Sequence, residues 1–135
     1  MTKMEQLNDF LGGPPQCIYL STIDGDKPRC RPLGLHHLYK NQIYFGVGDF
    51  KDVYRQLLAN PAAEVVACKG MKWVRINGRV VFEDQDAPVV KEIYENFMLR
   101  KHYEENGWTL KIFHFEEAEV QYIDMMTVTE TFKIG

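Results

Sequence analysis

The pattern of apolar and polar positions opens with a helical stripe and continues as strand-like alternation. In residues 2–11 the apolar side chains recur at helical spacing, and Thr2 with Glu5 forms a capping box, so we expect a short helix here. Three runs with strand periodicity follow, each bounded by turn residues. They are residues 17–23, 28–35 and 42–47. Their succession predicts a meander in which the second and third strands pair.

The second half of the chain mixes both periodicities. Asp49 is placed to cap a second helix, which the Asn-Pro pair at 60–61 ends. A hairpin follows, and apolar residues at helical spacing then predict a third helix from Asp86 to about Tyr103. The strands expected in this half are residues 63–68, 71–84, 108–124 and 127–134.

Together these elements predict a mainly β domain. About six strands, mostly joined by hairpins, carry three short inserted helices, and the regular strand–helix alternation of a parallel sheet is missing. We therefore expect a closed or nearly closed antiparallel β-barrel with short helices. The chain has 135 residues, 45% of them apolar, which suits a single domain over residues 1–135 with a substantial core.

Charge and composition narrow the class of protein. The net charge is −3 with a pI near 5.8, and like charges form no block, which argues against a broad nucleic-acid-binding surface. The sequence has no secretory leader pattern and no run of about 18 apolar residues, so we expect a cytoplasmic protein without a membrane partner. Three distant cysteines without a Cys-x-x-Cys pair favour reduced, partly buried thiols over a zinc site or a disulfide.

The segment PRCRPLGL, residues 28–35, holds the best candidate chemistry. Side chains alternate along a strand, so Arg29 and Arg31 share one face, and Pro32 restricts the segment to a sheet edge or a bulge. Lys51 stands in the first turn of the second predicted helix, where the helix N-terminus favours anions. If the second and third strands pair, these three cations converge on an anion such as phosphate. The alternative is two surface arginines and a solvated lysine.

Three segments in order carry a family resemblance. They are STIDGDKPRCRPLG, IYFGVGDFKDVYRQLLANP and the tryptophan-bearing strand WVRINGRVVFED. Over roughly residues 10–125 the chain resembles the pyridoxamine 5'-phosphate oxidase-like family of FMN-binding split barrels, and in particular its small bacterial members. The resemblance implies a six-stranded antiparallel split barrel of Greek-key type.

The resemblance also assigns expected cofactor-binding residues. It implies that the FMN phosphate is held by Arg29 or Arg31 and by Lys51. The flavin ring would lie along the backbone of Pro32, Leu33 and Gly34 and of Val47, Gly48, Asp49 and Phe50. The family site lies between two subunits of a homodimer, which makes Trp73 and Arg75 candidates for flavin or dimer contacts, or for interface packing alone.

The implied activity is an FMN-dependent oxidoreductase that moves hydride or electrons between a nicotinamide-type donor and a small acceptor. Two departures bear on this expectation. Val47 and Gly48 stand where relatives often carry polar residues such as Thr and Asn. The chain also has no counterpart of the serine- and glutamine-containing segment, or of the C-terminal arginine motif, that the oxidase uses around its substrate. This absence argues against pyridoxamine phosphate oxidation itself.

Two alternative functions are also compatible with the sequence. One is a non-catalytic protein of the same fold that stores or carries flavin or haem, and His36 and His37 are the haem candidates. Adjacent strand residues point to opposite faces, which disfavours a shared metal between these two histidines. Another is a partner- or single-strand nucleic-acid-binding barrel that stacks bases on Trp73 beside Arg75, against which the acidic net charge argues.

Overall fold

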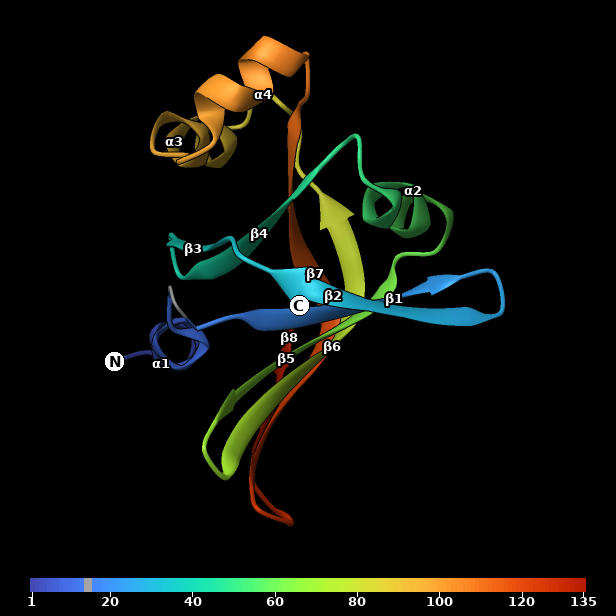
Figure 1. Cartoon of the computed structure of the whole chain (residues 1–135). Coiled ribbons are helices and arrows are strands. Elements are labelled where there is room, and N and C mark those ends of the chain that lie inside the picture. The colour runs from blue at the N-terminus through green and yellow to red at the C-terminus, as the bar shows by residue number, and fades with distance from the viewer. Residues whose placement is uncertain (14–15) are drawn as a thin grey trace.

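One curled antiparallel sheet forms the body of the molecule, shown in Figure 1. The structure is a computed structural model and describes residues 1–13 and 16–135. In these residues the helices are α1 (Lys3–Leu11), α2 (Asp52–Ala59), α3 (Pro88–Glu95) and α4 (Arg100–Asn106). The strands are β1 (Ile18–Asp24), β2 (Lys27–Leu33), β3 (His36–Tyr39), β4 (Gln42–Gly48), β5 (Ala62–Lys69), β6 (Lys72–Phe82), β7 (Leu110–Asp124) and β8 (Thr127–Ile134).

The strand order makes the sheet a half-barrel with two open edges. The order is β2-β1-β5-β6-β7-β4-β3, with β8 paired to β7, so β2 and β3 lie at the two ends. The expected mainly β, antiparallel class is confirmed, but the described residues form eight strands rather than six, and the barrel does not close. The additional strands arise because β3 forms between the second and third predicted strands and because β8 is a full strand.

The predicted pairing of the second and third strands is wrong. Strand β2 pairs with β1, whereas β4 pairs with β3 through its first half and with β7 through its second half. Lys40 and Asn41 explain the difference, because both adopt positive φ angles, 47° and 61°, and so form a tight turn that folds β3 onto β4. As a result Gly46, Val47 and Gly48 have β7 on one side and no strand of the described chain on the other.

Two clusters of apolar side chains hold these layers together. The larger fills the curl of the sheet, with Phe45 and Phe113 stacked at 5.6 Å between ring centroids, and α1 and α2 cover it. The smaller lies under α3 and α4 and includes Tyr103 and Leu110. Full burial of each large apolar side chain contributes about 1.5–3 kcal/mol, so both clusters fix the position of the strands between them.

The observed helices agree only in part with those predicted from the sequence. The capping box of α1 is confirmed, since Thr2 Oγ1 accepts from the Glu5 N–H and Glu5 Oε1 accepts from the Thr2 N–H. Asp49 does not cap α2, because its Oδ1 accepts from the Thr109 N–H at 2.9 Å and Lys51 occupies the N-cap position. The predicted third helix is two helices, α3 and α4, separated by residues 96–99.

Two further features concern the chain as a whole. None of the described helices is both long and apolar enough to cross a membrane. Cys17, Cys30 and Cys68 are free thiols, and all three are exposed, so the expected partial burial is wrong. Each lies at or beside a strand whose outer face is uncovered in the single chain.

Candidate functional site

A pocket of about 480 Å³ lies where the sheet fails to close, between the end of β2 and the second half of β4. We call it the seam pocket. Residues 31–35 form one wall, residues 46–48 form the other, and Lys51 and Val53 of the α2 region close one end. Residues 96–99, Tyr103 and Leu110 form the roof. Figure 1 shows α3 and α4 at this end of the molecule, opposite the tips of the β5–β6 and β7–β8 hairpins.

The structure brings together most of the sequence-predicted site residues. Those that line the seam pocket are Arg31, Pro32, Leu33, Gly34, Val47, Gly48 and Lys51. Those that do not line it are Arg29, Asp49, Phe50, Trp73 and Arg75. The two strands that supply the walls are not hydrogen-bonded neighbours, so the residues meet across an open edge rather than within a ladder.

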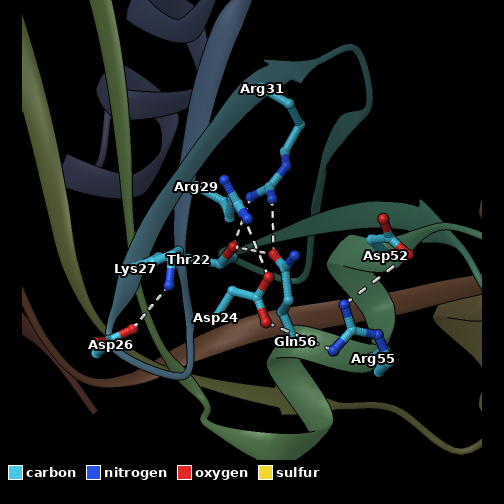
Figure 2. Close-up of polar contacts among 9 residues, drawn as sticks. All are labelled: Thr22, Asp24, Asp26, Lys27, Arg29, Arg31, Asp52, Arg55 and Gln56. Carbon is cyan, nitrogen blue, oxygen red and sulfur yellow. Dashed lines mark hydrogen bonds and ion pairs between the residues drawn. The ribbon is translucent and has the colours of Figure 1, made fainter.

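Arg31 lines the seam pocket, and Figure 2 shows its side chain extended toward Thr22 and Gln56. Its Nη1 donates to Leu20 O at 3.2 Å and to Thr22 Oγ1 at 2.7 Å, and its Nη2 donates to Gln56 Oε1 at 2.8 Å. None of these acceptors is a carboxylate, and Arg31 forms no ion pair within the described part of the chain. Burial lowers the pKa of its guanidinium, which nevertheless stays charged at neutral pH.

Arg29 has a different environment, although it shares a strand face with Arg31. Its Nε lies 3.4 Å from Asp24 Oδ2, and Arg55 approaches the other oxygen of the same carboxylate at 3.6 Å. Figure 2 shows the three side chains grouped beside α2. Asp24 therefore offsets the positive charge of Arg29, whereas Arg31 has no carboxylate partner in the described chain.

Lys51 supplies the second cation of the seam pocket. It is the N-cap residue of α2, where unpaired backbone N–H groups and the helix dipole favour an anion. Its Nζ lies 5.7 Å from the centroid of the Phe50 ring. The lining residues in the described chain include no Asp or Glu, so Arg31 and Lys51 give the pocket a net positive charge.

Glycine at position 48 allows the roof to approach the sheet. A Cβ atom there would lie 2.5 Å from the Phe50 ring and 2.8 Å from the Tyr103 hydroxyl, closer than such atoms pack. Burial, helped by the negative charge of Asp49, raises the pKa of Tyr103, so its hydroxyl stays protonated at neutral pH and can donate. The local packing therefore favours a glycine at position 48.

The roof is the part of the site that the sequence did not reveal. Residues 96–99 were expected inside a continuous helix, because the apolar spacing runs through Phe97 toward Tyr103. In the structure they form the break between α3 and α4, and Met98 and Leu99 are exposed by 88% and 51%. Asn96 is the one sequence signal for this break, since it serves as the C-cap residue of α3.

Trp73 and Arg75 lie on the sheet away from the seam pocket. The Arg75 guanidinium stands 5.2 Å from the Trp73 ring centroid and donates to Gln121 Oε1 at 3.2 Å. Its Nε lies 3.8 Å from Glu64 Oε1. Within the single chain these two residues therefore belong to the outer face of β6 and not to the pocket.

The histidines of the chain do not line the seam pocket. His36 is half-buried, with ring nitrogens 2.8 Å from Asn8 Oδ1 and 2.5 Å from Gly12 O, and His37 lies 2.6 Å from Glu92 Oε2. His114 contacts the carboxylates of Glu83 and Glu116. Among the described residues no group of three His, Cys, Asp or Glu side chains is placed to hold a metal ion. The pocket thus offers no histidine or cysteine ligand to a haem iron.

Comparison with known proteins places the chain in one family with one fold. A family model described as pyridoxamine 5'-phosphate oxidase matches residues 4–124. A NimC/NimA family protein from Clostridium acetobutylicum is 27% identical, with a TM-score of 0.79 over 97% of this chain and 92% of that one. No curated protein matches the chain.

Two more distant structures share the fold at lower identity. A FAD-binding protein from Mesorhizobium loti is 15% identical, with a TM-score of 0.57 over 91% of this chain and 96% of that one. A heme storage protein from Vibrio cholerae is 12% identical, with a TM-score of 0.58 over 86% of this chain and 92% of that one. At these identities the likeness concerns the fold alone.

Proposed function

Since the chain belongs to the pyridoxamine 5'-phosphate oxidase family, we propose that it binds FMN in the seam pocket and acts as a flavin-dependent oxidoreductase. The observation that carries this proposal is the pair of cations, Arg31 and Lys51, on a pocket whose remaining lining is mostly backbone and apolar side chains, with the polar side chains of Asn96 and Tyr103. A flavin mononucleotide has the matching chemistry, because it joins a planar ring to a phosphate dianion.

The pocket residues fit that ligand. Ligand pockets have volumes of about 300–1,000 Å³, and the 480 Å³ of the seam pocket lies within that range. Arg31, Lys51 and the N-terminus of α2 would hold the phosphate. The backbone of residues 32–34 and of residues 47 and 48 would flank the ring, and Phe97 and Leu99 would cover it.

Bound flavin would supply the transfer of hydride or electrons between a nicotinamide-type donor and a small acceptor. The chain itself would contribute position and electrostatics. Arg31 and Lys51 would anchor the anionic end, and the apolar side chains of Phe97 and Leu99 in the roof would lie over the ring. Among the described residues that line the pocket, Tyr103 is the one side chain besides Lys51 and Arg31 with a dissociable proton, and its hydroxyl is able to donate a hydrogen bond. Pyridoxamine phosphate is not the proposed substrate, since the oxidase's substrate motifs have no counterpart here.

We also propose that two chains form the working unit. The open roof, with Met98 exposed by 88%, leaves the seam pocket incompletely enclosed in one chain. A second copy would cover it, and Trp73 and Arg75 on the outer face of β6 are the proposed contacts between copies or with the partner's flavin. Asp49 and Phe50 would contribute through the backbone beside the ring, and Arg29 would add long-range charge only.

The second candidate is a protein of the same fold that carries or stores flavin without turnover. The same two cations and the same pocket support it, since binding and catalysis share these residues. Haem has less support than flavin, although the fold is shared with a heme storage protein, because histidine and cysteine are missing from the described lining of the pocket.

A reconstitution experiment tests both candidates. The purified protein is incubated with FMN, desalted and examined by visible absorption, with its mass measured by light scattering. We expect about one flavin per chain on a dimer. Under anaerobic conditions, NADH or NADPH should then bleach the flavin spectrum, and a small acceptor should restore it. A flavin that stays oxidised in excess donor would reject the oxidoreductase and favour the carrier; a colourless protein would reject both.

A further inference from the structure

A buried threonine and a buried glutamine stand behind Arg31. Thr22 of β1 and Gln56 of α2 are each 3% exposed, and Gln56 interrupts the apolar face that α2 buries through Val53 and Leu57. Burial of a polar side chain is unfavourable unless its hydrogen bonds are made. An apolar residue at position 56 would pack against the core without this cost, so the function of the amide must be sought in its partners.

The hydrogen bonds of Gln56 fix the orientation of its amide. Its Oε1 accepts from Thr22 Oγ1 at 2.6 Å and from Arg31 Nη2 at 2.8 Å. An arginine can only donate, so the oxygen and not the nitrogen of the amide must face Arg31. None of the hydrogen bonds between described side chains uses Gln56 Nε2. The two bonds to Oε1 therefore hold this side chain in place.

These contacts divide the five donors of the Arg31 guanidinium into two groups. Three N–H groups are occupied, two on Nη1 by Leu20 O and Thr22 Oγ1, and one on Nη2 by Gln56 Oε1. The Nε–H and the second Nη2–H have no partner in the described chain. A guanidinium fixed on one side in this way offers its remaining donors in one orientation, which lowers the entropy lost when an anion binds.

We propose that Gln56 is a positioning residue for Arg31, which with Thr22 orients the free donors of the guanidinium toward a phosphate monoester in the seam pocket. The proposal rests on the proposed function, because it takes the phosphate to lie beside Arg31. Its consequence is specific: Gln56 contributes to the affinity for FMN and not to the affinity for riboflavin, which has the same ring without the phosphate.

The test compares the two ligands in matched variants. Gln56→Met removes the acceptor at nearly constant length, Thr22→Val removes the hydroxyl at constant shape, and Thr22→Ser restores it. Dissociation constants for FMN and riboflavin are measured by quenching of flavin fluorescence, with thermal unfolding as the check on folding. We expect Gln56→Met and Thr22→Val to raise the dissociation constant for FMN about tenfold and to change that for riboflavin by no more than about twofold. Thr22→Ser should behave as the parent protein.

The outcomes separate this inference from the function on which it rests. If the parent protein prefers FMN to riboflavin and the variants keep that preference, Gln56 and Thr22 are only structural and the inference is wrong. If the affinities for FMN and riboflavin fall equally, the variants have disturbed packing and the inference is also wrong. If the parent shows no preference for FMN, the phosphate does not lie at Arg31, and the proposed function fails together with the inference. Thr22→Val supplies the answer if Gln56→Met does not fold.

Discussion

Phe50 stacks on the indole of Trp108, with ring centroids 3.8 Å apart and an angle of 18° between the planes. The pair joins the loop before α2 to the segment that enters β7, and the Tyr103 ring meets both residues edge-on. Phe50 is 44% exposed, so its ring packs along the surface rather than in the core. The stack therefore braces one end of the seam pocket from outside.

Loss of this stack should loosen the end of the seam pocket at which Lys51 lies. Phe50→Leu removes the ring contact but keeps an apolar side chain, and we expect it to lower the free energy of unfolding by about 0.5–1.5 kcal/mol. The chain has two tryptophans, so a Trp73→Phe background leaves Trp108 as the reporter. Its emission should shift to longer wavelength in the double variant. An unchanged spectrum would mean that the indole keeps its environment without Phe50.

The placement of the anion site is tested by removing its two cations. Arg31→Ala with Lys51→Ala should raise the dissociation constant for FMN by about a hundredfold or more, because each lost charge-assisted hydrogen bond contributes about 1.5–3 kcal/mol. Arg29→Ala is the matched control, since Arg29 pairs with Asp24 and does not line the pocket. Equal effects of the control and the double variant would place the phosphate elsewhere. Circular dichroism verifies that the fold is retained.

The irregularity between β6 and β7 depends on a glycine. The register shifts between Asn77 and Arg79, and a Cβ on Gly78 would lie 2.5 Å from the Cβ and 2.7 Å from the Cα of Ala118. Gly78→Ala should therefore destabilise the protein by about 1–3 kcal/mol through overpacking against backbone. Gly34→Ala is the comparison, because its added Cβ would meet nothing within 4 Å. Denaturant unfolding of both variants measures the difference, and similar midpoints would contradict the prediction.

A half-buried histidine, His36, should make stability depend on pH. Burial, which outweighs the hydrogen bond to Gly12, lowers the pKa of His36 from its ordinary value of 6.5. The unfolded chain then binds the proton more readily than the folded one, so stability is complete above about pH 6.5 and falls as the pH drops toward the folded-state pKa. His36→Gln should flatten the decrease in unfolding temperature between about pH 7 and pH 5. An equal slope in both proteins would contradict this assignment.

The carboxylate of Glu116 titrates below the pH range in which His36 is expected to act, so it does not interfere with the measurement of unfolding temperature. The hydrogen bond from His114 lowers the pKa of Glu116 from 4.5, opposed by a smaller effect of burial. Its contribution is present above the ordinary carboxyl pKa and is lost only as the pH falls further. The decrease assigned to His36 therefore comes first on acidification, and Glu116→Gln should leave it unchanged.

Local patterns in the sequence predicted the positions of helices and strands better than they predicted which strands pair. The capping box at Thr2, the strand of residues 28–35 and the helix before the Asn-Pro pair at 60–61 are signals carried by a few neighbouring residues. The joining of strands into a sheet is non-local, and four residues of β3 were enough to replace the expected neighbour of β4. Arg31 and Lys51 still meet at one pocket, because the open edge brings them together without the predicted ladder.

The residues that sequence reasoning missed lacked a distinguishing local signal. Gln56 lies between polar and apolar neighbours of α2 and has no pattern that marks it as buried. Its burial follows from the side on which α2 packs against β1, which depends on the whole sheet. The helical periodicity of the sequence continues through residues 96–99, whereas in the structure α3 ends at Glu95 and α4, which buries Tyr103 in the smaller cluster, begins at Arg100.

The gap between β2 and β4 also sets how the molecule can move. Backbone hydrogen bonds do not cross it in the described chain, and the short strand β3 links the two strands along the sequence. Widening the gap would displace side chains but break no rung of the sheet. Entry and exit of a ligand there can proceed on the time scale of loop motion, while the amides of the central strands remain protected from solvent exchange.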